Sequence, residues 1–353
     1  MTDSKQPTES KPQTEQIVSD ILSTIERERE REIVSRRFGL FDRKETLEQI
    51  GELLGITRER VRQLEKAVTA RLKASAEQGG LPGLEAFATL LVRELDEDGG
   101  IMRVTTLGEK ITSQDSRTEQ ARIAFIAQLC PALVVLEEDD QHYLSVGSAK
   151  LFDQKSLKKK IQDIVSTIKK HGEPAAVEAI TEKIGAKDAG QVQALALVSK
   201  QLATLNGLWG LTKWPVVNPK NIRDKIYVIL KEHGKHMHFN DIAKAIKDSE
   251  FKRKDVTTQA IHNELIKDKR FVLVGRGIYA LKEWGYEKGT VADIIADILR
   301  KEGAALHRDE IVKRVLKNRY VKETTILLNL QGKPQFRRTA KATYELVEDE
   351  PTS

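Results

Sequence analysis

A repeat of nearly constant period constrains this chain more than any other feature. Four short alternating stretches each contain one aromatic residue, at positions 143, 209, 279 and 344, and the spacings between them are 66, 70 and 65 residues. Each stretch closes a segment that opens with an amphipathic helix ending near glycine. The opening helices are predicted at 84–95, 157–170, 222–232 and 291–301, and the closing strands at 142–144, 208–211, 278–281 and 343–346. A fixed period with a constant order of elements indicates tandem modules.

Two shorter helical segments are predicted between each opening helix and its closing strand. The clearest hairpin spans residues 270–281, where alternating apolar residues flank a Gly275-Arg276-Gly277 turn that can adopt positive φ. Three helices followed by a small hairpin is the winged-helix plan. The predicted fold is therefore mainly α with small β-hairpin wings: a helix-turn-helix followed by four tandem winged-helix modules. We predict these modules at residues 84–147, 155–215, 221–286 and 289–348.

The segment before the repeats has a different pattern. Residues 1–16 are polar, contain two prolines and predict a disordered tail. Residues 17–78 are helical in pattern, and Gly79-Gly80 closes them. Within this segment, residues 47–54 carry an apolar stripe at helical spacing, Gly55 supplies a turn, and Thr57 is a natural N-cap for a second helix. The pattern predicts a helix-turn-helix.

The second helix of this pair separates into two faces on a helical wheel. The apolar face contains Val61, Leu64, Val68 and Leu72. The polar face offers groups that read base edges in the major groove and hold phosphates. We predict that Arg58, Glu59, Arg62 and Gln63 read bases and that Thr57, Arg60 and Lys66 contact phosphates. A merely solvated charged face is the alternative, and the preceding helix and glycine turn favour DNA.

Three stretches of this segment resemble a known family. Residues 36–40 (Arg-Arg-Phe-Gly-Leu), 46–51 (Thr-Leu-Glu-Gln-Ile-Gly) and 57–65 (Thr-Arg-Glu-Arg-Val-Arg-Gln-Leu-Glu) resemble the fourth conserved region of primary-type bacterial sigma factors. The resemblance spans about residues 26–73. It implies binding to the −35 promoter element, with Arg58, Glu59, Arg62 and Gln63 facing the DNA, and RNA polymerase as a partner. No stretch resembles the aromatic-rich second region that melts the −10 element, so a complete sigma factor is not expected.

A second resemblance covers residues 222–286. The stretch His236-Met237-His238-Phe239-Asn240-Asp241-Ile242 and the hairpin that runs to Trp284 are similar to the HARE-type winged helix. That domain occurs in the delta subunit of Gram-positive RNA polymerase and in several chromatin and restriction proteins. The resemblance implies an alternative function, a polymerase-associated accessory subunit whose winged helices mainly bind protein. A nucleoid or DNA-modification adaptor is a third hypothesis.

Charge differs between the repeats. The fourth repeat carries Lys313, Arg314, Arg337 and Arg338, and the third carries basic clusters at 252–254 and 267–270 and at Arg276. These clusters predict phosphate contacts, with ordinary solvation as an equal alternative. The first repeat carries an acidic run at 137–140, which would repel a phosphate backbone. We expect that repeat to pack against protein.

Composition and motifs argue against catalysis. The net charge is +6, which suits a polyanion, and a single cysteine, Cys130, excludes an intrachain disulfide and disfavours a zinc site. His233, His236 and His238 lack carboxylates at ligand spacing, and we expect His236 and His238 at the start of a second helix instead. No phosphate-binding loop, nucleophile elbow, signal peptide or membrane span is present in the sequence. The sequence therefore predicts a cytoplasmic, nucleoid-associated protein that binds double-stranded DNA, without a cofactor, metal, membrane or small-molecule substrate.

Overall fold

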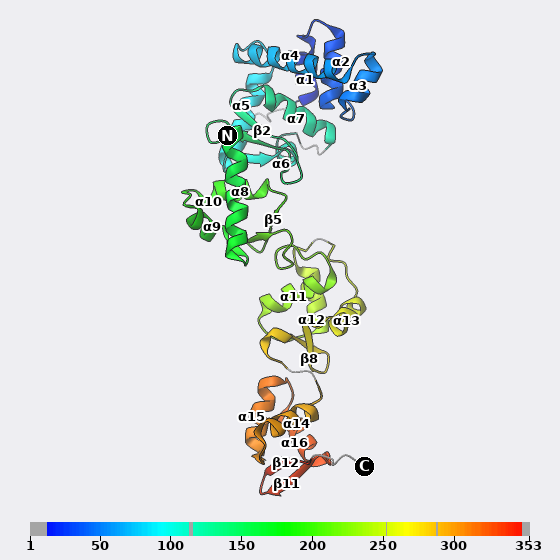
Figure 1. Cartoon of the computed structure of the whole chain (residues 1–353), viewed down its shortest axis with the longest axis vertical. Helices are drawn as coiled ribbons and strands as arrows, with labels where there is room; N and C mark the ends of the chain where they lie inside the picture. The colour runs from blue at the N-terminus through cyan, green and yellow to red at the C-terminus, as the bar shows by residue number, and fades with distance from the viewer. Residues whose placement is uncertain (1–12, 113–115, 252, 287–288, 348–353) are drawn as a thin grey trace, which may run out of the picture. The chain divides into compact units, whose positions relative to one another are not determined.

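The structure is a computed structural model that describes residues 13–112, 116–251, 253–286 and 289–347. Within these residues it has sixteen α-helices and four small antiparallel sheets of three strands each. The fold is therefore mainly helical, as the sequence predicts. The chain divides into two compact units, residues 1–213 and 214–353 (Figure 1).

Unit 1 begins with four helices. They are α1 (Thr14–Ser23), α2 (Glu28–Phe38), α3 (Leu47–Leu54) and α4 (Arg58–Glu77). A turn at residues 55–57 separates α3 from α4, and the two helices pack against each other. The predicted helix-turn-helix is confirmed. Its small core contains Ile33, Ile50 and Val61, all fully buried.

The predicted disordered tail is wrong at its C-terminal end. Residues 14–16 belong to α1, and Thr14 is only 3% exposed. Its hydroxyl donates to the Glu119 carboxylate at 2.7 Å, across a separation of 105 residues. When the hydrogen-bond partner of a polar residue is so distant in the chain, the local sequence cannot distinguish that residue from a disordered tail. Residues 1–12 lie outside the described part of the chain.

The helix-turn-helix segment and the first repeat share one hydrophobic core. Val18, Val34 and Leu72 from the first segment belong to the same buried cluster as Leu91 and Phe125 from the repeat. The rings of Phe38 and Phe125 lie 5.0 Å apart between centroids. Burial is thus continuous across the glycine-rich joint that was predicted to separate residues 17–78 from 84–147. The five-module division of the chain stays a prediction.

Each repeat contains three helices and a three-stranded sheet. Repeat 1 comprises α5 (Leu84–Glu97), β1 (Ile101–Arg103), α6 (Val104–Ile111), α7 (Arg117–Leu129), β2 (Leu133–Leu136) and β3 (Ser145–Ser148). Repeat 2 comprises α8 (Gln154–His171), β4 (Ala175–Ala176), α9 (Val177–Ile184), α10 (Ala189–Leu197), β5 (Leu202–Leu205) and β6 (Leu208–Leu211). Repeat 3 comprises α11 (Ile222–His233), β7 (Met237–His238), α12 (Phe239–Asp248), α13 (Thr258–Lys267), β8 (Phe271–Gly275), β9 (Ile278–Leu281) and the short 3-10 helix η1 (Lys282–Trp284). Repeat 4 comprises α14 (Val291–Glu302), β10 (Leu306–His307), α15 (Arg308–Asn318), α16 (Glu323–Gly332), β11 (Phe336–Ala340) and β12 (Thr343–Leu346).

The predicted opening helices and three of the four closing strands are confirmed. Helices α8, α11 and α14 end at Gly172, Gly234 and Gly303, each with left-handed φ, because glycine adopts that conformation without strain. The closing strand lies at the centre of every sheet, between its hairpin partner and a short strand that precedes the second helix. Those short strands were not predicted, since two or three residues are too few to show a period.

The predicted closing strand of repeat 1 is wrong. Strand β3 begins at Ser145, not at His142. His142 instead forms an isolated antiparallel bridge with Ser199, and the Tyr143 amide donates to the Val198 carbonyl at 2.9 Å. Residues 142 and 143 therefore contact repeat 2 rather than continuing the sheet of repeat 1.

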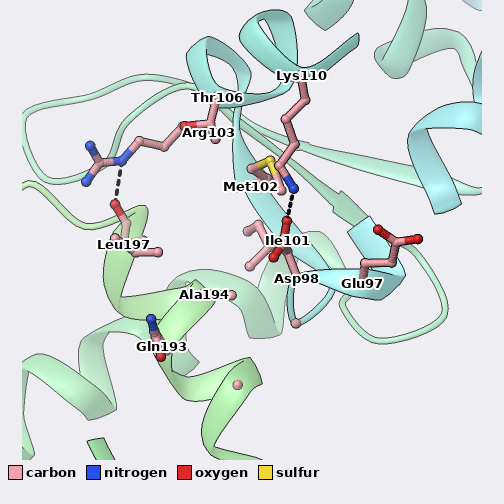
Figure 2. Close-up of a pocket in the computed structure, with 12 residues that line it drawn as sticks. Glu97, Asp98, Ile101, Met102, Arg103, Thr106, Lys110, Gln193, Ala194 and Leu197 are labelled. Atoms are coloured by element: carbon pink, nitrogen blue, oxygen red, sulfur yellow. Dashed lines mark hydrogen bonds and ion pairs between the residues drawn. The ribbon is translucent and has the colours of Figure 1, made fainter. Parts of the chain in front are cut away.

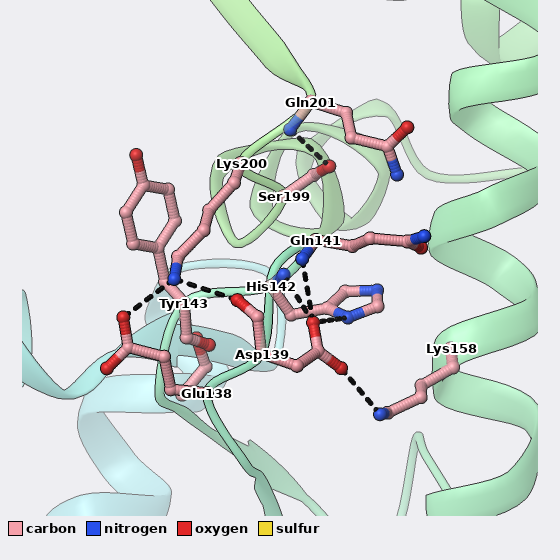
Figure 3. Close-up of polar contacts among 10 residues, drawn as sticks. Glu138, Asp139, Gln141, His142, Tyr143, Lys158, Ser199, Lys200 and Gln201 are labelled. Atoms are coloured by element: carbon pink, nitrogen blue, oxygen red, sulfur yellow. Dashed lines mark hydrogen bonds and ion pairs between the residues drawn. The ribbon is translucent and has the colours of Figure 1, made fainter.

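Ion pairs reinforce this joint between repeats 1 and 2 (Figure 3). Asp139 accepts a hydrogen bond from Lys158 Nζ at 2.8 Å and lies 2.7 Å from His142 Nδ1. Lys200 Nζ donates to Glu138 at 2.7 Å and to the Asp139 carbonyl at 2.8 Å. The first repeat was expected to pack against protein, and two residues of its acidic run contact a neighbouring repeat of the same chain.

This joint predicts a mild acid sensitivity. The hydrogen bond from Lys158 holds the pKa of Asp139 well below its usual range. Because the pKa of Asp139 is lower in the folded chain, its charge stabilises the folded protein at pH values above the unfolded-state pKa of about 3.9. That stabilisation is lost as the pH falls through the folded-state pKa. Asp139 is 38% exposed, so we expect Asp139→Asn to cost only about 0–1 kcal/mol at neutral pH. Thermal unfolding of wild type and Asp139→Asn at several pH values measures this difference in stability.

The control for that experiment is Asp140→Asn, because Asp140 is exposed in the same run. The wild-type advantage over Asp139→Asn should shrink below about pH 4, where the Asp139 carboxylate of the unfolded chain begins to protonate while that of the folded chain stays charged. The Asp140→Asn chain should follow wild type at every pH. An advantage of wild type over Asp139→Asn that stays constant down to the most acidic pH would contradict the assignment.

The third helices of repeats 1 and 2 are covered by neighbouring parts of unit 1. Helix α7 packs against α1, α2 and α4. Helix α10 packs against β1, and a Cβ atom at Gly99 would lie only 2.5 Å from the Gly190 carbonyl oxygen. A cavity of about 440 Å³ remains beside this contact, and Arg103 at its edge donates to the Leu197 carbonyl (Figure 2).

The third helices of repeats 3 and 4 have exposed faces. Gln259, Asn263 and Ile266 are exposed on α13, and Thr324 and Leu328 on α16. The two repeats meet instead through the loop before α16, where the Tyr320 amide donates to the Val274 carbonyl at 3.1 Å. The Arg319 guanidinium also donates to the carbonyls of Leu273 and Gly289.

Candidate nucleic-acid interface

Local capping defines where α4 begins. The hydroxyl of Thr57 accepts a hydrogen bond from the Arg60 amide at 3.2 Å, as the N-cap prediction requires. The preceding helix α3 begins with a capping box, in which Thr46 and Gln49 each accept from the other's backbone amide. Gly55 then turns the chain with φ of 63°. These interactions lie within a few residues of one another, so the sequence alone predicts most of them.

A close backbone approach fixes the angle between α3 and α4. Gly51 lies in α3, and a Cβ atom there would be 2.7 Å from the carbonyl oxygen of Ile56 in the turn. That distance is shorter than real Cβ contacts allow, so glycine is required. The role of Gly51 was not predicted. A glycine inside a predicted helix, four residues before the turn, is the signal that could have found it.

The burial of α4 agrees with the predicted wheel. Val61, Val68 and Leu72 are buried, and Leu64 is half-buried. The opposite face presents all four predicted base readers to solvent, namely Arg58, Glu59, Arg62 and Gln63. The predicted phosphate contacts on this unit, Thr57, Arg60 and Lys66, are exposed as well. The structure thus brings these seven residues together on the first three turns of one helix.

Arg62 and Glu59 form a bidentate pair on that face. Arg62 Nε donates to one oxygen of Glu59 at 2.9 Å, and Nη2 donates to the other at 2.7 Å. This pair lowers the pKa of Glu59 and raises the pKa of Arg62, so both groups are charged at neutral pH. A guanidinium has five N–H donors, and the pair uses two of them. Arg62 therefore keeps three donors for a ligand, and Glu59 orients them.

The other exposed groups have weaker partners. Arg58 Nη1 donates to Glu48 on α3 at 3.2 Å, and both side chains are more than half exposed. Arg60 Nη1 donates to Gln63 at 3.4 Å. Glu48 was not predicted as a partner of Arg58, because the turn between α3 and α4 brings the two residues together and no helical period links them. Exposed pairs of this kind contribute about 0–1 kcal/mol and exchange readily for a DNA partner.

The four predicted phosphate contacts in repeat 4 have different surroundings. Arg314 donates to Glu302 and Glu310, each at 2.7 Å, and these bonds raise its pKa. Arg337 pairs with Glu345 on the neighbouring strand. Lys313 is exposed, and Arg338 donates to the Ala340 carbonyl of its own strand. Arg314 and Arg337 are therefore compensated by carboxylates, which weakens the case for their contact with phosphate.

The three histidines do not form a metal site. No group of three or more histidine, cysteine, aspartate or glutamate residues that could hold a metal ion occurs among the described residues. His238 is the N-cap of α12 and accepts from the Asn240 amide at 3.3 Å, which confirms its expected place at a second helix. The ring of His236 packs on that of Tyr320, with 4.3 Å between centroids. None of the described helices is long and apolar enough to span a membrane.

The geometry of α3 and α4 defines a DNA-binding helix-turn-helix, with a capped second helix and a polar exposed face. Residues 27–74 match the family model described as sigma-70, region 4. The match links this segment to DNA binding in transcription initiation and agrees with the resemblance found in the sequence. It lies within unit 1 and ends before the first of the four repeats begins.

Two relatives match the same segment. The RNA polymerase sigma factor SigA of Bacillus sp is 44% identical over 57 residues, which are 16% of this chain and 15% of the relative. The RNA polymerase sigma factor sigB of Arabidopsis thaliana is 48% identical over 57 residues, which are 16% of this chain and 9% of the relative. The chain thus spans less than a sixth of the length of either relative.

Among solved structures, a bacterial selenocysteine-specific elongation factor EF-Sec aligns with 78% of this chain and 40% of its own. The sequence identity is 14% and the TM-score is 0.21. A likeness at this level carries no argument about fold or function.

Proposed function

We propose that this protein binds promoter DNA in a sequence-specific way and acts in bacterial transcription initiation or its regulation. The observation that carries the proposal is the exposed face of α4, which presents Arg58, Glu59, Arg62 and Gln63 in a segment that matches sigma-70 region 4. The −35 type of promoter element and RNA polymerase are the partners that this likeness supports. Each of the seven predicted residues on α4 has a role in the proposed complex.

In the proposed complex, Arg62 reads a guanine. The donors left free by Glu59 include two on Nη1 and one on Nη2, and a guanine offers two acceptors, O6 and N7, on its major-groove edge. Because Glu59 already fixes the guanidinium, less side-chain entropy is lost on binding. The Glu59 oxygens have further lone pairs that accept from a cytosine amine. Arg58 and Gln63 contact neighbouring bases.

The phosphate contacts position α4 in the groove. Arg60 and Lys66 supply the charge, and the Thr57 hydroxyl lies at the helix N-terminus, where the helix dipole also favours a phosphate. Such contacts carry no sequence information and release counterions on binding. Base and phosphate roles therefore predict different responses to mutation.

The test is a selection from random duplexes with wild type, Arg62→Ala and Lys66→Ala, followed by salt titration of the selected sequences. We expect Arg62→Ala to lose about 1–3 kcal/mol and the preference at one position. Lys66→Ala should weaken binding to all sequences alike and reduce the salt slope by about one unit. Lys187→Ala, which removes an exposed charge from repeat 2, is the control. If wild type selects no motif, or Arg62→Ala selects the same motif with equal affinity, α4 does not read bases.

A polymerase-associated accessory role is the second candidate, and the exposed surface of repeat 4 favours it. Leu328 on α16 is 68% exposed and Leu316 on α15 is 45% exposed. Exposed apolar side chains of this size suit contact with protein better than contact with phosphate. In this role the winged-helix repeats mainly bind polymerase, as the resemblance of repeat 3 to the delta subunit implies. Leu328→Glu should then weaken co-purification with polymerase and leave the DNA motif unchanged, whereas the first proposal predicts no effect on either.

A further inference from the structure

The structure separates the four repeats by whether the third helix is available to a ligand. Helix α7 is covered by neighbouring parts of unit 1 and is mostly buried. Helix α10 packs against β1 but keeps Gly190, Gln193 and Leu197 exposed, a face without a charged side chain. Helices α13 and α16 also keep an exposed face. A contact with nucleic acid through a third helix is therefore best supported in repeats 3 and 4. The chemistry of the two exposed faces differs.

The exposed face of α13 carries amides and an apolar side chain. Gln259, Asn263, Ile266 and Lys267 lie at i, i+4, i+7 and i+8, so they form one stripe along the helix, opposite the buried Ile261. Gln259 Nε2 donates to Asn263 Oδ1 at 3.1 Å, which holds the two amides side by side. Ile266 is 66% exposed. On α16 the corresponding stripe has no pair of amides, because Leu328 lies at its centre.

Four cations of repeat 3 have no carboxylate partner. Arg253, Lys267, Lys269 and Arg276 make no ion pair within 4.0 Å among the described residues, and all four are exposed. Arg276 lies at the tip of the hairpin between β8 and β9. In repeat 4, Arg314 and Arg337 are paired with glutamates, whereas Lys313 and Arg338 have no ion pair among the described residues. Unpaired cations close in sequence to a polar helix can hold the phosphates that flank a groove, so the amides of α13 are what distinguishes repeat 3.

We propose that the exposed face of α13 is a second DNA-reading surface and that it prefers A·T base pairs in the major groove. An asparagine or glutamine amide matches adenine, because its oxygen accepts from N6 and its nitrogen donates to N7. An apolar side chain matches the thymine methyl group. No arginine lies on this stripe, and its one lysine, Lys267, is the last residue of α13, beyond the two amides. The second surface rests on the proposed function only in that both treat the ligand as duplex DNA.

The experiment uses the full chain and three duplex probes that lack the motif selected by α4. One probe contains A·T pairs, one contains G·C pairs, and one contains inosine·cytosine pairs. Inosine presents guanine's acceptors in the major groove but lacks the minor-groove amine, so the third probe separates major-groove reading from minor-groove width. All three are titrated against the Arg62→Ala chain, in which base reading by α4 is already weakened. A failure of the first proposal thus leaves this measurement intact.

We expect the Arg62→Ala chain to bind the A·T probe about 5- to 150-fold more tightly than the G·C and inosine·cytosine probes. Adding Asn263→Ala should remove most of that preference, and Gln259→Ala is a second variant at the same surface. Gln331→Ala on α16 is the matched control and should leave the preference unchanged. Equal binding of all three probes, an inosine·cytosine probe that binds as well as A·T, or a preference that survives both Asn263→Ala and Gln259→Ala would overturn the proposal. The first of these outcomes would assign the α13 face to a protein partner.

Discussion

Replacing Gly51 by alanine should destabilise the helix-turn-helix and abolish tight DNA binding. Two effects oppose each other. Alanine in a helix interior gains roughly 0.5–1 kcal/mol over glycine. Its Cβ atom, however, would lie 2.7 Å from the Ile56 carbonyl oxygen, and backbone cannot move aside as a side chain can. Overpacking of this kind costs about 1–3 kcal/mol, so the clash should prevail.

The same substitution should change the angle between α3 and α4, because the turn must open to admit the methyl group. A displaced α4 cannot keep both its phosphate contacts and its base contacts. We therefore expect the substitution to weaken the free energy of binding to the selected duplex by more than it lowers the free energy of unfolding. Stability is measured by thermal unfolding and affinity by titration. Gly332→Ala is the control, because nothing lies within 4 Å of a Cβ atom there. A Gly51→Ala chain with unchanged affinity would disprove the role of the close approach.

Replacing Phe125 by alanine should have the largest effect on stability. Phe125 is 1% exposed and belongs to the core that the helix-turn-helix segment shares with repeat 1. Truncation of a buried phenylalanine costs about 3–5 kcal/mol. For a unit of this size, that loss corresponds to a fall in Tm of roughly 6–20 °C. The physical reason is a cavity between α7 and α2, since the Phe125 ring packs against Phe38.

Because the core is shared, amides of α4 should lose hydrogen-exchange protection together with those of α7. This is the measurement that distinguishes one cooperative unit from two independent modules. Leu328→Ala in unit 2 is the control, since the side chain is 68% exposed and such changes stay within about 0.5 kcal/mol. If Phe125→Ala exposes α7 while α4 keeps its protection, the helix-turn-helix folds independently of repeat 1.

The sequence by itself determined the elements whose signals are local. The helices ending at Gly172, Gly234 and Gly303 follow from apolar spacing and from glycine's access to left-handed φ. The start of α4 follows from the Thr57 cap, and its two faces follow from a period of about 3.6 residues. The candidate interface on α4 was predictable for the same reason, since its residues are neighbours on one helix.

Only the tertiary structure decided which of these elements keep a face exposed to a ligand. The sequence of α7 gives no sign that Arg122 is buried and donates to the Leu40 carbonyl at 2.8 Å, across 82 residues. Nor does the sequence of α1 show that Thr14 begins a helix and donates a hydrogen bond to Glu119. Such contacts depend on partners far along the chain, and a local period cannot encode which partner covers a given face. The same reason explains why four similar repeats differ: neighbours cover most of α7 and one face of α10, whereas α13 and α16 keep exposed faces.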